Sequence, residues 1–328
     1  MKKIILTLTF GFITLIAFSQ GNPFGKVFSN FNYDLSAEEG TNAFKEFEIK
    51  RAYLGYSHQI ADDFSAKVTF DVGKNEGGSS YTAFLKIAAL NWKANDKMSI
   101  NFGMVGTKNF KFMEKTWGKR YIYKSFQDQN KWANSADAGL TIDYKISDNL
   151  SVDAQILNGD GYKKVQGSDG LMRGGAGIIY KMGELSIRAA RDIMPRSTYD
   201  STDASQNINT VAMAYSMQNI KVGGEYNLRE NSGNVLENTS SSMSFYGSME
   251  IAESLSLFGR YDDATSENTN GDRWNIDNEG SLIIVGVEKE MVKGVKIAIN
   301  LQSWKEATAD EIEAEAQNTL YLNLEYKF

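Results

Sequence analysis

Apolar and polar residues alternate along most of this chain with a period of two. Between Phe64 and Val72 every even-numbered residue is apolar and every odd-numbered residue is polar. The same alternation occurs over 138–146, 220–228 and 295–302. Successive side chains of a β-strand point to opposite faces, so the pattern predicts strands with one apolar and one polar face.

Counting the alternating segments predicts about sixteen strands, most of them near the roughly 9–11 residues that a tilted transmembrane strand needs. They are expected near 27–34, 46–58, 64–72, 82–93, 98–105, 138–146, 150–157, 173–182, 185–193, 208–217, 220–228, 241–251, 255–262, 281–289, 295–304 and 318–328. The alternation leaves the inward face of two segments open, 47–56 and 82–90.

The connections between these strands alternate in length. Tight polar turns occur at 60–65, 94–99, 146–151 and 251–256, where Asp and Asn favour turns. Long polar connections occur at 36–44, 73–81, 106–137, 158–171, 194–207, 229–240, 263–279 and 305–316. This plan predicts an all-β fold, a transmembrane antiparallel up-and-down β-barrel with short periplasmic turns and long extracellular loops.

The two ends of the chain support an outer-membrane destination. Residues 1–19 combine a basic start, an apolar run and small residues before Gln20, which predicts a cleaved signal peptide followed by a single barrel domain over 20–328. A membrane anchor is the alternative, but the run is short for a spanning helix. The last strand ends in Leu324, Tyr326 and Phe328, which resembles the signal read by the barrel assembly machinery of bacterial outer membranes.

The composition narrows the class of protein. There is no cysteine, so disulfides and thiol chemistry are absent, and the two prolines suit a ladder-bonded chain. The mean hydropathy of -0.38 argues against a helical membrane protein. The formal charge of -6 becomes -8 without Lys2 and Lys3, which argues against a nucleic-acid partner. No nucleotide motif or metal-ligand cluster implies a cofactor.

A barrel of about sixteen strands encloses an aqueous channel, so a channel is the expected function. Charged side chains on the polar face would line it and tune ion selectivity, unless they only solubilise the lumen. The candidate pore-lining residues are Lys67, Asp71, Arg188, Lys221, Arg260 and Lys296.

The third long connection, 106–137, is basic and aromatic. Its segment 106–131 carries seven Lys and Arg against Glu114 and Asp128, so its net charge is 7 - 2 = +5. A loop in this place folds inward as a constriction in many sixteen-stranded porins, and a basic constriction would attract anions. The alternative places it outside, against lipopolysaccharide. The candidate constriction residues are Lys108, Lys111, Lys115, Lys119, Arg120 and Lys124.

A family resemblance rests on the early strands. Residues 47–56 (FEIKRAYLGY), the turn 62–65 (DDFS) and the strand ending in Thr69-Phe70-Asp71 resemble the phosphate-selective porin O and P family. Residues 85–92 and the strand leading to Phe102-Gly103 fit the same pattern, so the resemblance covers roughly the first 150 residues. It implies an anion-preferring, trimeric porin.

We therefore expect a porin of the outer membrane, embedded among its lipids and lipopolysaccharide, that lets small hydrophilic solutes diffuse. Two alternatives stand beside it. The barrel could act through its loops as an adhesin or scaffold. An outer-membrane hydrolase is the other, but Ser57 and His58, which include the only histidine, point to opposite faces of a strand and cannot pair.

Overall fold

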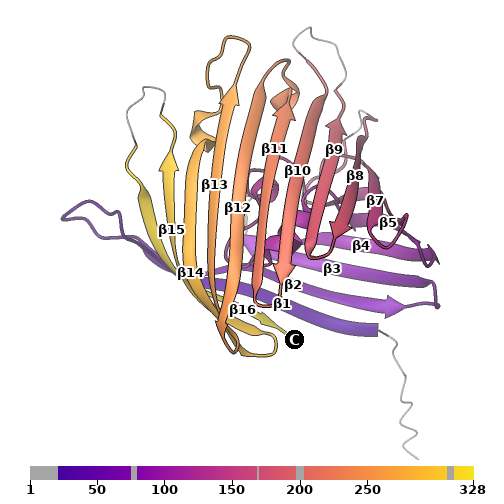
Figure 1. Cartoon of the computed structure of the whole chain (residues 1–328), viewed down its shortest axis with the longest axis horizontal. Helices are drawn as coiled ribbons and strands as arrows, with labels where there is room; N and C mark the ends of the chain where they lie inside the picture. Colours follow the sequence, from indigo (N-terminus) through magenta and orange to yellow (C-terminus); the bar gives the residue numbers. More distant parts are fainter. Residues whose placement is uncertain (1–20, 75–79, 168–169, 197–202, 309–313) are drawn as a thin grey trace, which may run out of the picture.

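The computed structural model describes residues 21–74, 80–167, 170–196, 203–308 and 314–328. Within this described part, sixteen antiparallel strands form one closed barrel (Figure 1). The barrel closes because β1 (Gly21–Asp34) pairs with β16 (Gln317–Lys327) as well as with β2 (Lys45–Gln59). The predicted fold class and strand number are confirmed, whereas the predicted signal peptide, 1–19, lies outside the described residues.

Neighbouring strands in the sequence are neighbours in the barrel throughout. The other strands are β3 (Phe64–Lys74), β4 (Tyr81–Asn95), β5 (Met98–Gly106), β6 (Ala136–Lys145), β7 (Leu150–Leu157), β8 (Arg173–Met182), β9 (Leu185–Met194), β10 (Gln206–Met217), β11 (Ile220–Glu230), β12 (Thr239–Ala252), β13 (Leu255–Glu267), β14 (Gly280–Val292) and β15 (Val295–Glu306). Two short helices, α1 (Lys111–Trp117) and α2 (Phe126–Gln129), lie between β5 and β6, and two 3-10 turns are η1 (Ser232–Asn234) and η2 (Ile276–Asn278).

The short connections gather at one end of the barrel and the long ones at the other, and we call these the short-turn end and the long-loop end. One predicted loop is shorter than expected. Residues 263–267 were predicted to be a connection, but they continue β13 and pair with β12, Asp263 opposite Met243 and Glu267 opposite Thr239. Polar residues can extend a strand at this end because ladder hydrogen bonds do not require apolar side chains.

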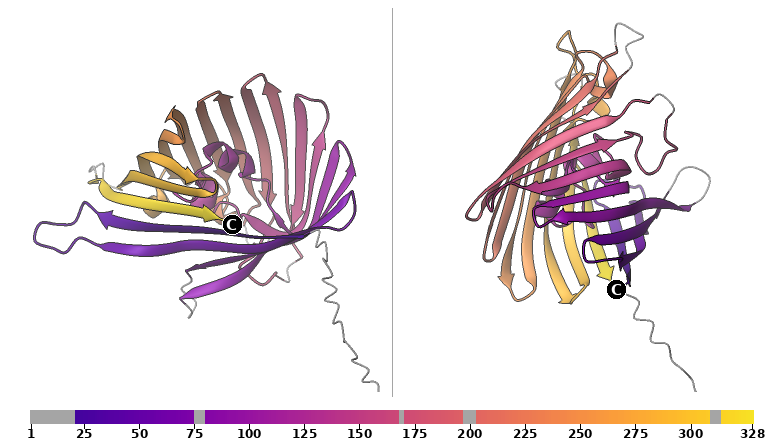
Figure 2. Two further views of the ribbon diagram at one scale, coloured as in Figure 1. Left: turned by 90° about the horizontal axis from the view of Figure 1, so that it is seen from below. Right: turned by 90° about the vertical axis from the view of Figure 1, so that its right-hand side faces the viewer.

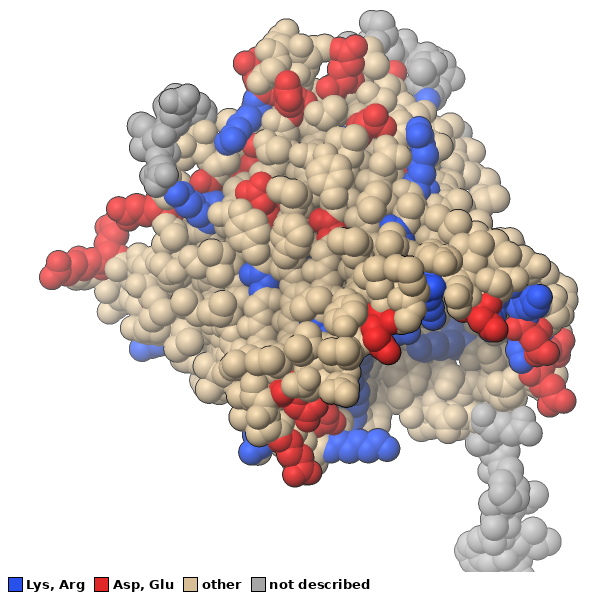
Figure 3. Space-filling model, viewed as in Figure 1, with Lys and Arg blue, Asp and Glu red and all other residues tan. Residues whose placement is uncertain are grey.

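The outer surface of the barrel is largely apolar, and its charged side chains gather towards the two ends (Figure 3). Aromatic rings face outward near both edges of this belt. Trp92 and Tyr144 lie near the short-turn end, Tyr226 and Tyr261 lie near the long-loop end, and all four are 39–46% exposed. An apolar belt edged by aromatic rings is what a lipid-facing surface requires. No helix in the described residues is long and apolar enough to cross a membrane.

Two β-bulges break the alternation where the sequence left the inward face open. In β2, Phe28 and Ser29 of β1 oppose Arg51 and Ile49, so Lys50 is the extra residue. In β4, Thr69 and Phe70 of β3 oppose Ile87 and Leu85, so Lys86 is the extra residue. A bulge shifts the side-chain parity by one and re-aims the side chains beside it.

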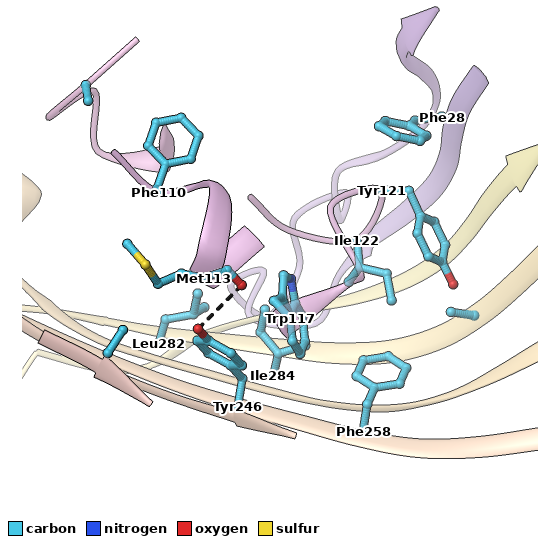
Figure 4. Close-up of a cluster of buried hydrophobic side chains, with 13 residues drawn as sticks. Phe28, Phe110, Met113, Trp117, Tyr121, Ile122, Tyr246, Phe258, Leu282 and Ile284 are labelled. Atoms are coloured by element: carbon cyan, nitrogen blue, oxygen red, sulfur yellow. Dashed lines mark hydrogen bonds between the residues drawn. The ribbon is translucent and has the colours of Figure 1, made fainter. Parts of the chain in front are cut away.

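The chain between β5 and β6 folds into the barrel. Viewed along the barrel, α1 lies inside the ring of strands (Figure 2). Its apolar side chains form a buried cluster with inward side chains of the wall (Figure 4). The main members are Phe110, Met113, Trp117, Tyr121 and Ile122 of this segment and Phe28, Tyr246, Phe258, Leu282 and Ile284 of the strands.

Candidate functional site

The segment 107–135, which we call the inner loop, crosses the lumen, and cations of the barrel wall bind its backbone. Arg188 Nη2 donates to the carbonyl oxygen of Lys108 at 3.1 Å, and Lys221 Nζ donates to that of Lys115 at 2.8 Å. Arg260 Nη1 donates to the carbonyl oxygen of a third loop residue, Lys124, at 2.8 Å. The loop is thus fastened at several points along its length.

Further wall side chains repeat this arrangement. Lys50 Nζ, from the bulge of β2, donates to the carbonyl oxygen of Ile122 at 3.1 Å. Arg173 Nη2 at the start of β8 donates to the carbonyl oxygen of Trp132 at 3.3 Å. Hydrogen bonds to charged donors contribute about 1.5–3 kcal/mol each, so the fastened loop is a fixed partition of the lumen.

The structure places all six candidate pore-lining residues on the inner face, but most of them are engaged rather than free in water. Arg188 and Arg260 are 2% and 3% exposed, and each pairs with a carboxylate of the wall. Asp71 is 2% exposed and pairs with Arg51 Nε at 3.2 Å. These three charges are paired inside the barrel, where the wall and the loop leave them almost no contact with water.

The remaining three candidates differ from one another. Lys296 Nζ pairs with Glu288 at 3.2 Å, and Lys221 binds the loop backbone as described. Lys67 is exposed, and its Nζ stands 4.9 Å from the centre of the Phe24 ring. Their function in lining the pore stays a prediction.

The six candidate residues of the loop are of three kinds. Three make buried ion pairs: Lys108 with Asp143, Lys119 with Glu288 at 2.9 Å, and Arg120 with Glu114 and Asp128. These side chains hold the loop together and to the wall. Lys111 and Lys115, four residues apart on α1, are exposed and make no ion pair within the described residues.

Lys124, the sixth candidate, is largely buried, and its ammonium group is paired with no carboxylate among the described residues. Burial lowers the pKa of Lys124 to about 8, against the attraction of Asp128. The positive charges of Arg51 and Arg120 add to the lowering. Its charge therefore depends on pH within the range that a bilayer experiment can reach.

The bulges of β2 and β4 bring together a cationic cluster that the sequence did not predict. Arg51 Nη1 donates to Tyr53 Oη at 3.3 Å, and Lys86 Nζ stands 5.1 Å from the Tyr53 ring and 5.0 Å from the Tyr162 ring. Tyr162 Oη donates to Asp71 Oδ2 at 2.5 Å. Cations over aromatic faces are held without losing their charge. The irregular alternation at 47–56 and 82–90 was the one signal of these residues in the sequence.

A cavity of about 480 Å³ opens at the short-turn end, between the inner loop and the wall of β1–β5. Lys67 and Lys111 lie in its lining, and Lys108 forms part of its loop side. On the other side of α1, the apolar cluster packs the inner loop against the wall (Figure 4). The cavity thus lies against one wall of the barrel, β1–β5.

A closed sixteen-stranded barrel with an apolar belt and an inward loop defines the class of outer-membrane diffusion channels. Similar solved structures share the fold. OmpF of Salmonella typhi, in complex with daunomycin, gives a TM-score of 0.69 at 14% identity, over 94% of this chain and 97% of that one. An anion-selective porin from Comamonas acidovorans gives 0.68 at 12% identity, over 94% and 99%. The trimer form of OmpT from Vibrio cholerae gives 0.62 at 14% identity, over 94% and 99%.

The family assignment comes from the first half of the barrel. Residues 25–173 match the family described as phosphate-selective porin O and P. The resemblance read from the early strands is confirmed, and the chain is a porin of the outer membrane. A comparison with curated proteins gave no match.

Porins are channels rather than enzymes, so the hydrolase alternative is set aside. The local geometry agrees, because Ser57 Oγ lies 3.5 Å from the carbonyl oxygen of Asn22, and the ring of His58 stacks on Tyr56. The described residues contain no group of three or more His, Asp or Glu side chains that could hold a metal ion.

Proposed function

We propose that this porin passes small anions by passive diffusion along the wall of β1–β5. The observation that carries the proposal is the pair of exposed lysines that line the open cavity, Lys67 and Lys111. Like Lys115, which is exposed on the same helix as Lys111, they have no carboxylate partner within the described residues. Most other charges of the lumen are neutralised in pairs. Unpaired charges of one sign between low-dielectric walls raise the local concentration of counter-ions.

The charge arrangement favours anions over cations at the narrow part as well. Lys86, Lys124 and Arg51 stand near the path between the loop and β2–β4, against the carboxylates of Asp71 and Asp128. Interactions between exposed charges fall off over about 8 Å at physiological salt, so only charges close to the path act on a passing ion.

The test is the reversal potential of single channels in a planar bilayer under a salt gradient. The wild type should reverse on the anion side. A triple variant, Lys67→Gln, Lys111→Gln and Lys115→Gln, should lose most of this preference while keeping the conductance of an open channel. The matched control is Lys45→Gln, Lys164→Gln and Lys289→Gln, which removes three exposed lysines from outside the cavity and should change nothing. A cation-sided reversal of the wild type would overturn the proposal.

We further propose that the protein assembles as a homotrimer that contacts lipopolysaccharide at its long-loop end. The trimer form of OmpT from Vibrio cholerae supports the proposed trimer.

We also propose that the barrel assembly machinery recognises Leu324, Tyr326 and Phe328. The exposed, stacked rings of Tyr326 and Phe328 support this proposal. Mass measurement in detergent tests the trimer, and the yield of folded barrel after deletion of Phe328 tests the assembly signal.

A further inference from the structure

Besides lysines, the lining of the cavity at the short-turn end contains several uncharged polar side chains, which attraction of a simple anion does not require. In an antiparallel barrel, inward side chains of neighbouring strands stand side by side in rows across the wall. One row of this cavity wall is polar and uncharged over five successive strands, β2–β6. Its members are Gln59, Ser65, Asn91, Asn101 and Thr141, each the Cα partner of the next.

Hydrogen bonds within this polar row hold its side chains in place. Asn91 Nδ2 donates to Asn101 Oδ1 at 2.9 Å, and it also lies 2.7 Å from Ser99 Oγ. Asn101 Nδ2 donates to Thr141 Oγ1 at 3.1 Å. The row therefore presents ordered amide and hydroxyl groups towards the cavity. Asn91 uses both of its N–H donors on Ser99 and Asn101, so a ligand would meet its amide oxygen and the second N–H of Asn101.

The neighbouring row is hollow. Its members on β4, β5 and β6 are Ala89, Gly103 and Gly139, which carry almost no side chain. Gly103 has a φ of 115°, and a Cβ there would stand 2.3 Å from the carbonyl oxygen of Ala88, so a larger residue does not fit. The backbone itself thus keeps this part of the cavity empty.

Two cations complete the cavity. Lys67 belongs to the hollow row, as the Cα partner of Ala89, and Lys111 reaches the cavity from α1 on the loop side. The space of about 480 Å³ is within the range of small-molecule binding sites, roughly 300–1,000 Å³. It is large for a bare inorganic anion, which would fill only part of it.

We propose that this cavity binds an anionic, hydroxyl-rich solute of the size of a monosaccharide phosphate. The phosphate pairs with Lys67 and Lys111, and the sugar hydroxyls exchange hydrogen bonds with the amides of Asn91 and Asn101. This inference rests on the proposed anion path, to which it adds a substrate class. Binding is weak and reversible, as conduction requires a solute that can also leave.

The experiment measures block of the chloride current in a planar bilayer, with the probe added on the short-turn side. Glucose 6-phosphate, inorganic phosphate and glucose are compared by their half-blocking concentrations. Glucose 6-phosphate should block at about a tenfold lower concentration than inorganic phosphate, as expected for two further hydrogen bonds. Glucose alone should block least.

Variants separate the two parts of the cavity. Asn91→Ala with Asn101→Ala should bring glucose 6-phosphate to the level of inorganic phosphate without moving the reversal potential. Asn32→Ala, an inward amide of β1 that does not line the cavity, is the matched control and should keep the preference. A stable single-channel step shows in each case that the barrel is folded.

Equal block by the two phosphates in the wild type would overturn this inference and leave the anion preference standing. Retention of the sugar-phosphate preference in the double amide variant would also overturn it, because the polar row would then not be the site. A cation-sided reversal potential would instead remove the proposed function itself.

Discussion

The inner loop makes a packed apolar contact with one wall of the lumen and faces a polar cavity at the other. Towards β10–β15, the inner loop packs Met113 and Trp117 into one buried cluster with Tyr246, Phe258 and Ile284 (Figure 4). Towards β1–β5, the loop presents Lys111 to an open, polar cavity. The first contact fixes the position of the loop, and the second is where a solute can pass.

The difference shows how a wide barrel becomes a selective one. Sixteen strands alone enclose a channel too broad to discriminate small ions by charge. Apolar packing on one side is non-directional and strong, whereas the carbonyl oxygens of the loop are bound by wall cations at defined points. Together they leave one narrow path whose charges are set by few side chains.

The largest expected effect comes from breaking the packed side. Trp117→Ala removes the central ring of the apolar cluster, and substitutions of this kind cost about 3–5 kcal/mol in a well-packed core. We expect the loop to leave the wall, so that single-channel conductance rises and becomes noisy. Trp92→Ala, which removes an outward ring that is 40% exposed, is the control and should leave the conductance unchanged. An unchanged conductance for Trp117→Ala would show that the loop stays docked without this cluster.

A smaller effect is expected where α1 rests on β11. A Cβ at Gly223 would stand 2.5 Å from Tyr246 Cε2 and 2.6 Å from Thr116 Cγ2. Gly223→Ala should therefore overpack this contact at a cost of about 1–3 kcal/mol, seen as a lower melting temperature in detergent and a shifted conductance. Gly106→Ala on the open side meets its first neighbour at 3.9 Å and should be neutral. Equal effects of the two substitutions would contradict the asymmetry of the lumen.

Removing lysines from the open side and from the packed side should have a smaller effect than disturbing the packing. Lys67→Gln with Lys111→Gln takes two charges from the open side, and Lys221→Gln with Lys296→Gln takes two from the packed side. Each exposed charge near the path attracts an anion and repels a cation by on the order of 0.5 kcal/mol. Removing the first pair should therefore lower the anion-to-cation permeability ratio by about thirtyfold. The second pair should change it much less, because Lys296 is already neutralised by Glu288. Reversal potentials measure both, and the reverse order would place the path on the other wall.

The smallest effect is a pH dependence. Lys124 has its pKa lowered to about 8, so it is charged below that pH and loses its proton above it. The anion preference should accordingly fall by a small step as the pH rises through about 8. The Lys124→Gln variant, measured over the same range, should lack the step. A step of equal size in that variant would assign it to another group.

The fold could be predicted from the sequence, because strand alternation and connection length repeat over the whole chain. The prediction failed locally where the chain departs from a regular ladder. The bulges at Lys50 and Lys86 change which face each following residue occupies, and two-residue periodicity cannot show which residue is the extra one. For this reason Arg51 and Lys86 were missing from the predicted site.

The position of the inner loop was left open for a different reason. Its basic and aromatic residues suit either the lumen or the outer surface. A signal existed in the wall: Tyr246, Phe258 and Ile284 are apolar residues at positions where the alternation expects polar ones. Only their convergence in three dimensions shows that they face the same apolar segment of the loop. The ion pairs of Lys108, Lys119 and Arg120 likewise join residues far apart in the chain or across the loop.

The pairing of β1 with β16, which closes the barrel, bears on the order in which parts of the barrel form. The ladder ends with Gly25 and Phe328 exchanging hydrogen bonds at 2.8 and 3.1 Å, so residues from opposite ends of the sequence close the ring. The inner loop is bound by strands that come much later in the sequence. Arg260 donates to the carbonyl oxygen of Lys124, and Tyr121 donates to Glu288, 167 positions later. Contacts of such separation form slowly. We therefore expect the narrow path to form late in folding, after the strands that hold the inner loop are in place.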